Sequence, residues 1–228
     1  NIYEVSNDSL VLDVDFESSN ETHIFDKSGK NNHLLIQGNN EILEDSPLDG
    51  KYISFDGSDG NYIISRSDDF IYEGNDDSIT VVMWSRYEDN GDKNGLFRHG
   101  APFSSDGFSL YFDSIGTNLG GNIKSSVNGN SNFYYNHNYV IEHLSDDWHQ
   151  YVVKIKTGDF IELYYDGSLI EQENITHLEV DFSQNYYVFG TYAINRDELD
   201  GDIDEISIYN NVYIYSFKCK CSRHWSKA

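Results

Sequence analysis

Acidic residues recur at every second position in one short stretch near the end of the chain: Asp200, Asp202 and Asp204. β-branched and hydroxyl residues follow up to Tyr209, and turn residues bound the stretch, which predicts a strand over 201–210. Side chains two positions apart on a strand share one face, so these carboxylates would repel each other unless a cation or water screened them. Calcium prefers oxygen ligands of this kind. The stretch is therefore a candidate for an acidic, calcium-bearing seam.

A second candidate is the aromatic and amide-rich stretch 133–139. Tyrosine rings stack on the apolar C–H faces of sugars, and asparagine and histidine form hydrogen bonds with hydroxyl groups. The predicted carbohydrate-binding residues are Tyr134, Tyr135, Asn136, His137 and Tyr139. We expect residues 128–147 to form an irregular loop that holds them. The alternative is that Phe133 and Tyr135 pack inside the fold and the rest is ordinary loop, because aromatic side chains more often pack than bind ligands.

Catalytic chemistry is not supported by the sequence. Retaining glycan hydrolases use two carboxylates about 5–5.5 Å apart, which one strand can supply through a pattern such as Glu-x-Asp-x-Glu. The stretch Glu171-Gln172-Glu173 has spaced acids but lacks the middle aspartate. There is no Gly-x-Ser-x-Gly, paired-histidine zinc motif or phosphate-binding loop. We therefore assign no catalytic residue and expect a protein that is not an enzyme.

The composition excludes two kinds of partner. The 228 residues include 39 acidic and 15 basic side chains, for a formal net charge of −24. Such a charge repels phosphates, which argues against nucleic acid or an anionic membrane as partner. No stretch approaches the roughly eighteen continuous apolar residues of a membrane-spanning helix, so no membrane insertion is expected. The chain has neither an initiating methionine nor a signal-peptide pattern, which indicates a piece of a longer, multidomain chain.

Three segments divide the chain. Residues 1–9 form an entry segment without a pattern, 10–211 the folded domain, and 212–228 a basic C-terminal tail or linker. The tail carries the only cysteines, Cys219 and Cys221, which are too close together in the sequence to staple the body of the domain.

About a dozen segments of the domain show strand-like alternation or β-branched runs between turn residues. They cover residues 10–16, 33–37, 51–56, 61–65, 78–87, 94–99, 107–113, 122–127, 148–155, 160–165, 168–172, 186–192 and 201–209.

Their spacing predicts a sandwich of two β-sheets. We expect a hairpin between 51–56 and 61–65 across an Asp-Gly turn, and two further hairpins between 148 and 172. The long apolar segment 78–87 is predicted to be a central strand, and 122–127 an edge strand.

Six segments, taken in order, resemble the concanavalin A-like lectin/glucanase superfamily, and in particular its laminin-G-like (LamG/pentraxin-type) domains. They are Leu12 to Glu17 with the turn Asp26 to Asn32; Lys51 to Gly57 with Tyr62-Ile63; Ser78 to Trp84; Trp148-His149; Ile161 to Leu169; and Gly201 to Asn210.

The resemblance implies a jelly-roll β-sandwich of two curved antiparallel sheets. It also implies a structural calcium that ties the first strands to the last, with carboxylates from Glu17 and Asp204 and backbone carbonyls from the loop near Gly38. The same fold carries lectins, adhesion modules and glycanases, so it does not decide the function.

The function expected from these features is a non-catalytic recognition module, extracellular or on a cell or particle surface, that binds carbohydrate with possible help from calcium. One alternative is a protein–protein adhesion or assembly module of a cell-surface, viral or phage protein. Another is a glycan-cleaving enzyme of the same fold. The partner is therefore expected to be a glycan or a surface protein.

Overall fold

A computed structural model describes most of the predicted domain. The described residues are 9–46, 48, 50–65, 70–72, 77–87, 94–100, 107–112, 118–126, 132–140, 147–176, 180–182, 186–193 and 196–212, with backbone only in 118–126, 132–140, 193 and 196. The cysteine-bearing tail from residue 213 onward and residues 1–8 lie outside them.

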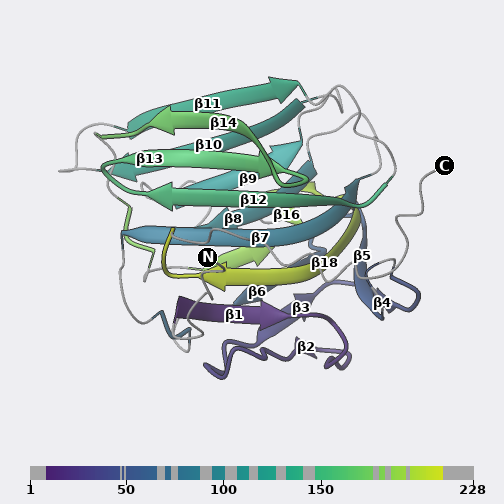
Figure 1. Cartoon of the computed structure of the whole chain (residues 1–228). Coiled ribbons are helices and arrows are strands. Elements are labelled where there is room, and N and C mark those ends of the chain that lie inside the picture. The colour runs from purple at the N-terminus through teal and green to yellow at the C-terminus, as the bar shows by residue number, and fades with distance from the viewer. Residues whose placement is uncertain are drawn as a thin grey trace.

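Two eight-stranded antiparallel sheets form the layers of a sandwich (Figure 1). The first sheet runs in the order β14 (Ser168–Asn174), β13 (Phe160–Tyr165), β12 (His149–Lys156), β7 (Ser78–Tyr87), β18 (Asp200–Tyr209), β5 (Tyr52–Asp56) and β4 (Glu41–Leu43), with β1 (Leu10–Val14) also paired to β18. The second runs β11 (Asn132–Val140), β10 (Asn118–Ser126), β9 (Gly107–Phe112), β8 (Asn94–His99), β15 (Tyr187–Phe189), β6 (Tyr62–Ser65), β3 (Leu34–Gln37) and β2 (His23–Ile24). A small hairpin joins β16 (Thr191–Ala193) to β17 (Arg196–Glu198). The predicted all-β sandwich is confirmed.

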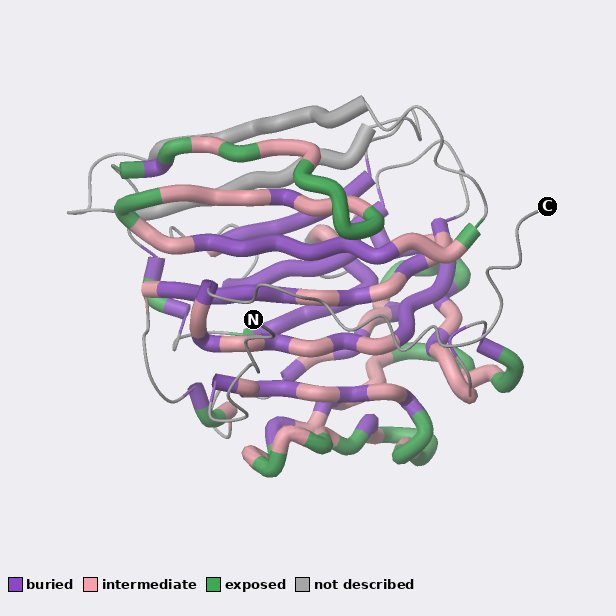
Figure 2. The backbone as a smooth tube through the Cα atoms, viewed as in Figure 1, coloured by how far each residue is buried: buried purple, intermediate pink, exposed green. Residues whose placement is uncertain are grey.

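The core lies between the two sheets, where the buried segments of both layers meet (Figure 2). On β7, buried Ile79, Val81 and Met83 alternate with side chains on the outer face, as expected for a strand with one face against the core. Phe97 and Phe189 of the second sheet pack with tilted rings, 5.1 Å between ring centroids, within the same core. Alternation therefore determines which residues of each strand can reach an outer face and bind a ligand.

The first and last strands pair, in agreement with the family resemblance, which implied that they are tied together. Leu12 of β1 lies opposite Ile208 of β18, and β18 also pairs with the central strand β7. The predicted central position of 78–87 and both hairpins between 148 and 172 are also confirmed.

The predicted hairpin between 51–56 and 61–65 is wrong. β5 pairs with β4 and β18 in the first sheet, whereas β6 pairs with β3 and β15 in the second. The turn after Asp56 carries the chain between the layers, because Phe55 and Ile63 both face the core from opposite sides. An Asp-Gly turn signals a change of direction but does not determine which strands pair.

Two predictions about the second sheet are also wrong. Residues 118–126 form an inner strand, because β10 lies between β9 and β11, and residues 132–140, expected to be loop, form the edge strand β11. The predicted segment 186–192 is divided at Gly190 into β15 and β16. Gly190 has a φ of +84° and a side chain there would meet the Phe55 ring at 2.5 Å, so the chain bends where only glycine fits.

Candidate functional site

A β-bulge in β18 determines how its acidic residues are placed. The register shifts between Asp204 and Ser207, and Glu205 has a φ of +50°. The extra residue lets Ile203 and Ile206, three positions apart, both face the core, while Asp204 remains on the outer side. The bulge therefore places Asp204 beside a loop from another part of the chain.

Asp202 is neutralised by a basic residue of the neighbouring strand. It lies opposite Arg86 of β7, whose Nε and Nη2 both donate to one carboxylate oxygen of Asp202, with the Nε contact at 2.8 Å. Only 5% of the Asp202 side chain is exposed, so the arginine offsets the cost of burying this charge.

Asp204, two residues further, has no such partner among the described residues. Its carboxylate accepts a hydrogen bond of 2.5 Å from the Ser46 hydroxyl and one of 2.7 Å from the Glu205 backbone N–H. Burial raises the pKa of the Asp204 carboxyl to about 7; the two hydrogen bonds lower it in part, and the charges of Glu205 and Asp15 raise it further. The site is thus a buried carboxylate held by neutral donors in an acidic environment.

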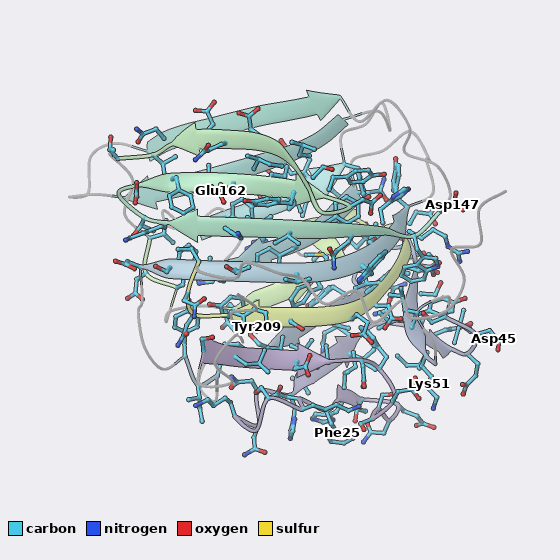
Figure 3. The ribbon with its side chains drawn as sticks, viewed as in Figure 1. Phe25, Asp45, Lys51, Asp147, Glu162 and Tyr209 are labelled. Carbon is cyan, nitrogen blue, oxygen red and sulfur yellow. The ribbon has the colours of Figure 1, made fainter. Side chains whose placement is uncertain are left out.

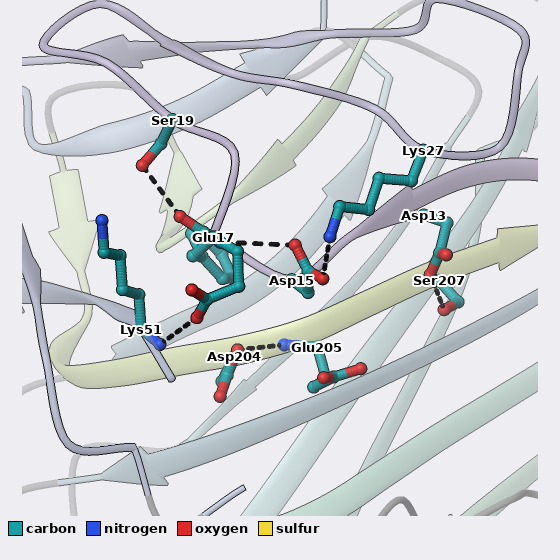
Figure 4. Close-up of polar contacts among 10 residues, drawn as sticks. Asp13, Asp15, Glu17, Ser19, Lys27, Lys51, Asp204, Glu205 and Ser207 are labelled. Atoms are coloured by element: carbon teal, nitrogen blue, oxygen red, sulfur yellow. Dashed lines mark hydrogen bonds and ion pairs between the residues drawn. The ribbon is translucent and has the colours of Figure 1, made fainter. Parts of the chain in front are cut away.

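Glu17 is held by the same loop that reaches Asp204. The backbone N–H of Lys51 donates to Glu17 at 2.5 Å, and a side chain at Gly50 would collide with that carboxylate. Figure 4 shows Asp204 on β18 and Glu17 on the neighbouring loop that follows β1. The structure therefore brings these two predicted residues to one region through Ser46, Gly50 and Lys51. Gly38 packs against Asn61, and the described loop residue that contacts Asp204 is Ser46.

The five predicted carbohydrate-binding residues lie on one strand, so they alternate between its two faces. Tyr135 lies opposite Ile123 of β10, which lies opposite Phe108 of β9, and Phe108 belongs to the core. His137 and Tyr139 occupy the same core-facing register. These three residues therefore do not share a face with the other two.

The remaining two occupy the outer register of the second sheet. Asn136 lies opposite Asn122, which lies opposite Ser109 and, one strand further, Arg98. Tyr134 lies one outer position along β11. This row of hydroxyl, amide and guanidinium residues crosses four strands from β11 to β8.

Arg98 is a buried cation at the end of this row. The residue is 5% exposed, and its terminal nitrogens donate to the backbone carbonyls of Gly100 at 2.7 Å and Tyr192 at 3.3 Å. Burial lowers the pKa of the Arg98 guanidinium to about 10, so it stays charged at neutral pH.

Comparison with known families decides the classification. The family model described as "Concanavalin A-like lectin/glucanases superfamily" matches residues 55–213, which is more than half of the chain. The chain belongs to this superfamily. No curated protein matches it.

Solved structures of clostridial toxins share the superfamily fold of this chain. The binding domain of Paraclostridial Mosquitocidal Protein 1 is 16% identical with a TM-score of 0.66, covering 91% of this chain and 50% of that one. The binding domain of botulinum neurotoxin DC in complex with rat synaptotagmin II is 19% identical with a TM-score of 0.67, covering 91% and 49%. The same domain in complex with SialylT is 18% identical with a TM-score of 0.63, covering 94% and 50%. This superfamily member thus spans about half the length of those chains.

The calcium expected from the superfamily resemblance fits the seam only partly. Asp204 offers a buried oxygen without a cationic partner in the described region, and the Ser46 hydroxyl is adjacent. Among the described residues, however, no group of three or more His, Cys, Asp or Glu side chains is arranged to hold a metal ion. Hydroxyl, carbonyl and water oxygens would therefore have to complete the coordination that calcium needs.

Sequence reasoning missed a polar aromatic cluster on the outer face of the first sheet. The Trp148 ring lies edge-on to Tyr52 at 5.5 Å, and the Arg86 guanidinium lies over Trp148 at 5.7 Å. The outer layer of this sheet also carries Glu162 and Tyr209 (Figure 3). The cluster joins segments far apart in the chain, so no local signal could have identified it.

Among the described residues, no helix is long and apolar enough to cross a bilayer.

Proposed function

We propose that this chain is a non-catalytic binding module whose ligand is a carbohydrate, within a larger protein that acts outside the cell or on a surface. The observation that carries the proposal is the outer register of the second sheet, where Asn122 and Asn136 lie opposite each other, in line with the buried Ser109 and Arg98. Hydroxyl and amide groups at that spacing suit the hydroxyl groups of a sugar, and Tyr134 supplies an aromatic residue one outer position along.

The non-catalytic part of the proposal is supported by two observations. The sequence lacks the paired carboxylates of a glycan hydrolase. The structures reported above are all described as binding domains, one in a complex with a protein and one with SialylT.

Two neighbouring tyrosines provide a matched test of the carbohydrate site. Tyr134 lies in the outer register of β11. Tyr134→Ala should therefore lower the affinity for a glycan found on a glycan array and leave the melting temperature nearly unchanged. Tyr135 lies in the core-facing register, so Tyr135→Ala should lower the melting temperature by several degrees. A glycan bound equally by the wild type and Tyr134→Ala would contradict the proposed surface, and binding to no glycan would contradict the function.

We also propose that calcium assists by binding at Asp204 beside Ser46 and Glu17. An ion that binds only the folded state raises the melting temperature. Millimolar calcium should therefore stabilise the EDTA-treated wild type but not Asp204→Asn. Equal melting temperatures of the wild type with calcium and with EDTA would overturn the calcium site without affecting the carbohydrate proposal.

A protein partner is the second candidate, and the Trp148–Tyr52–Arg86 cluster favours it. Tryptophan, tyrosine and arginine dominate the energetics of protein interfaces. In this case Trp148→Ala should abolish capture of the partner, while glycan binding stays unchanged. Loss of glycan binding in Trp148→Ala would instead place the carbohydrate site on the first sheet.

A further inference from the structure

Arg98 is a buried positive charge that no carboxylate of the described residues neutralises. The chain contains 39 acidic and only 15 basic residues, yet among the described residues no carboxylate contacts Arg98. Both of its hydrogen bonds go to neutral backbone carbonyls. A buried charge without an opposite partner is costly, so this residue is where an anionic ligand would gain most.

The β16–β17 hairpin builds the surroundings of this arginine. It packs on β8, and β16 also contacts β9. Gly95 makes this approach possible, because a side chain there would lie 1.8 Å from the Tyr192 backbone nitrogen. The contact brings the Tyr192 carbonyl to Arg98 and stacks the Tyr192 ring edge-on against Tyr111, with 4.9 Å between the ring centroids.

The outer location of Arg98 follows from alternation along β8. Its neighbour Phe97 lies in the core between the sheets. Tyr111 and Val188 are buried but do not belong to that core, which is consistent with a second layer covered by the hairpin. Arg98 lies in this second layer, opposite Val188 on one side and Ser109 on the other.

The free groups of Arg98 match a carboxylate. A guanidinium has five N–H donors in a planar fork, of which the two carbonyls use two. The remaining donors can bind both oxygens of a carboxylate, which is also planar and carries a single negative charge. The half-buried Tyr192 ring offers a surface for the C–H face of a sugar ring, and the Ser109–Asn122–Asn136 row begins beside the arginine.

We infer that Arg98, beside Tyr111 and Tyr192, binds the carboxylate of an acidic sugar whose neighbouring neutral sugars lie along the Ser109–Asn122–Asn136 row. The inference rests on the proposed carbohydrate function and names the class of glycan. The net charge of −24 opposes an anion at long range, but salt screens that field over about 8 Å at physiological ionic strength, so the local arginine dominates within the site.

Two acidic probes and their neutral counterpart test the assignment: sialyllactose, 3′-sulfated lactose and lactose. Calorimetry with the wild-type chain should give at least tenfold tighter binding of sialyllactose than of lactose, and weaker binding of the sulfated probe than of sialyllactose. Arg98→Gln should remove the preference for sialyllactose, and Arg98→Lys should retain only part of it, because lysine keeps the charge but lacks the planar fork. Tyr134→Ala should weaken sialyllactose and lactose by a similar factor.

Each outcome has a separate consequence. Equal affinity of the wild type for sialyllactose and lactose overturns the role of Arg98 but preserves carbohydrate binding. Binding of the sulfated probe as tight as sialyllactose overturns the carboxylate assignment. Binding of none of the probes, together with an empty glycan array, contradicts the proposed function itself. If Arg98→Gln does not fold, the comparison of the three probes on the wild type still decides the question.

Discussion

Asp204 on the first sheet and Arg98 on the second are opposite in charge but alike in their surroundings. They are 1% and 5% exposed, and the hydrogen-bond partners of both are neutral: a hydroxyl and a backbone N–H for Asp204, and two backbone carbonyls for Arg98. Burial works against the charged form of each, so the pKa of Asp204 is raised and that of Arg98 is lowered.

Asp202 differs from both, because it is a buried charge that a side chain of the same protein neutralises. It is as buried as Asp204 and lies two residues away on the same strand, but Arg86 binds its carboxylate. The difference is that a basic side chain neutralises Asp202, whereas none of the described residues does so for Asp204. This comparison is the reason why we propose a cation as ligand of Asp204 and an anion as ligand of Arg98.

The largest expected effect is a pH dependence of stability that comes from Asp204. Its folded pKa is about 7 and its unfolded value 3.8, so between these values only the folded state binds the proton. The stabilising contribution is therefore fully present below about pH 4 and is lost as the pH rises through 7, by up to about 4 kcal/mol. Urea unfolding of the calcium-free protein across this range should show the decrease, and Asp204→Asn should flatten it.

The matched control for this prediction is Asp59→Asn, in an exposed turn. It should keep the wild-type pH profile. A wild-type profile that Asp204→Asn leaves unchanged would mean that Asp204 is not the buried acid described here.

The second prediction concerns the ion pair between Arg86 and Asp202. Arg86→Met leaves the Asp202 carboxylate buried without a partner, which should lower the free energy of unfolding by about 2–3 kcal/mol. The double variant Arg86→Met/Asp202→Asn should recover much of this loss. The exposed pair Lys51–Glu44, at 3.6 Å, is the control, and Lys51→Met should cost less than about 1 kcal/mol. If urea unfolding showed the same loss of stability for Arg86→Met and Lys51→Met, burial of the Asp202–Arg86 pair would have no effect on its contribution to stability.

The third and smallest predicted effect concerns the hairpin that covers Arg98. Gly95→Ala forces the Tyr192 backbone away from β8 and should cost about 1–3 kcal/mol through overpacking, with a loss of the preference for sialyllactose. Gly158→Ala meets no neighbouring atoms, so only its φ of +70° is strained, at about 1 kcal/mol, and binding should stay intact. A stable Gly95→Ala that still distinguishes the two sugars would show that the hairpin does not position the site.

Much of the fold could be predicted because strand alternation depends only on residues that are close together in the sequence. The apolar positions of β7 and the acidic positions of β18 identified both strands, and the family resemblance implied that the first strands lie beside the last. The hairpin at Asp56 failed because a turn does not specify the sheet in which the next strand pairs.

The sites were less predictable because their contacts join distant parts of the chain. Ser46 and Asp204 are 158 positions apart, and Arg98 and Tyr192 are 94 apart. The composition of β11 indicated a sugar-binding stretch, but only its pairing with β10 shows that Asn136 and His137 lie in opposite registers. That Arg98 has no carboxylate partner in the described part of the chain could not be predicted from the sequence.

The central claim is that the outer face of the second sheet is the surface that binds glycan, and an NMR titration tests it most directly. The ¹⁵N-labelled wild-type chain would be titrated with the best ligand from the glycan array. The account predicts that amide shifts concentrate on β8 to β11 and on Tyr192, and that they saturate together. Shifts confined to Tyr52, Arg86 and Trp148 on the first sheet would contradict it.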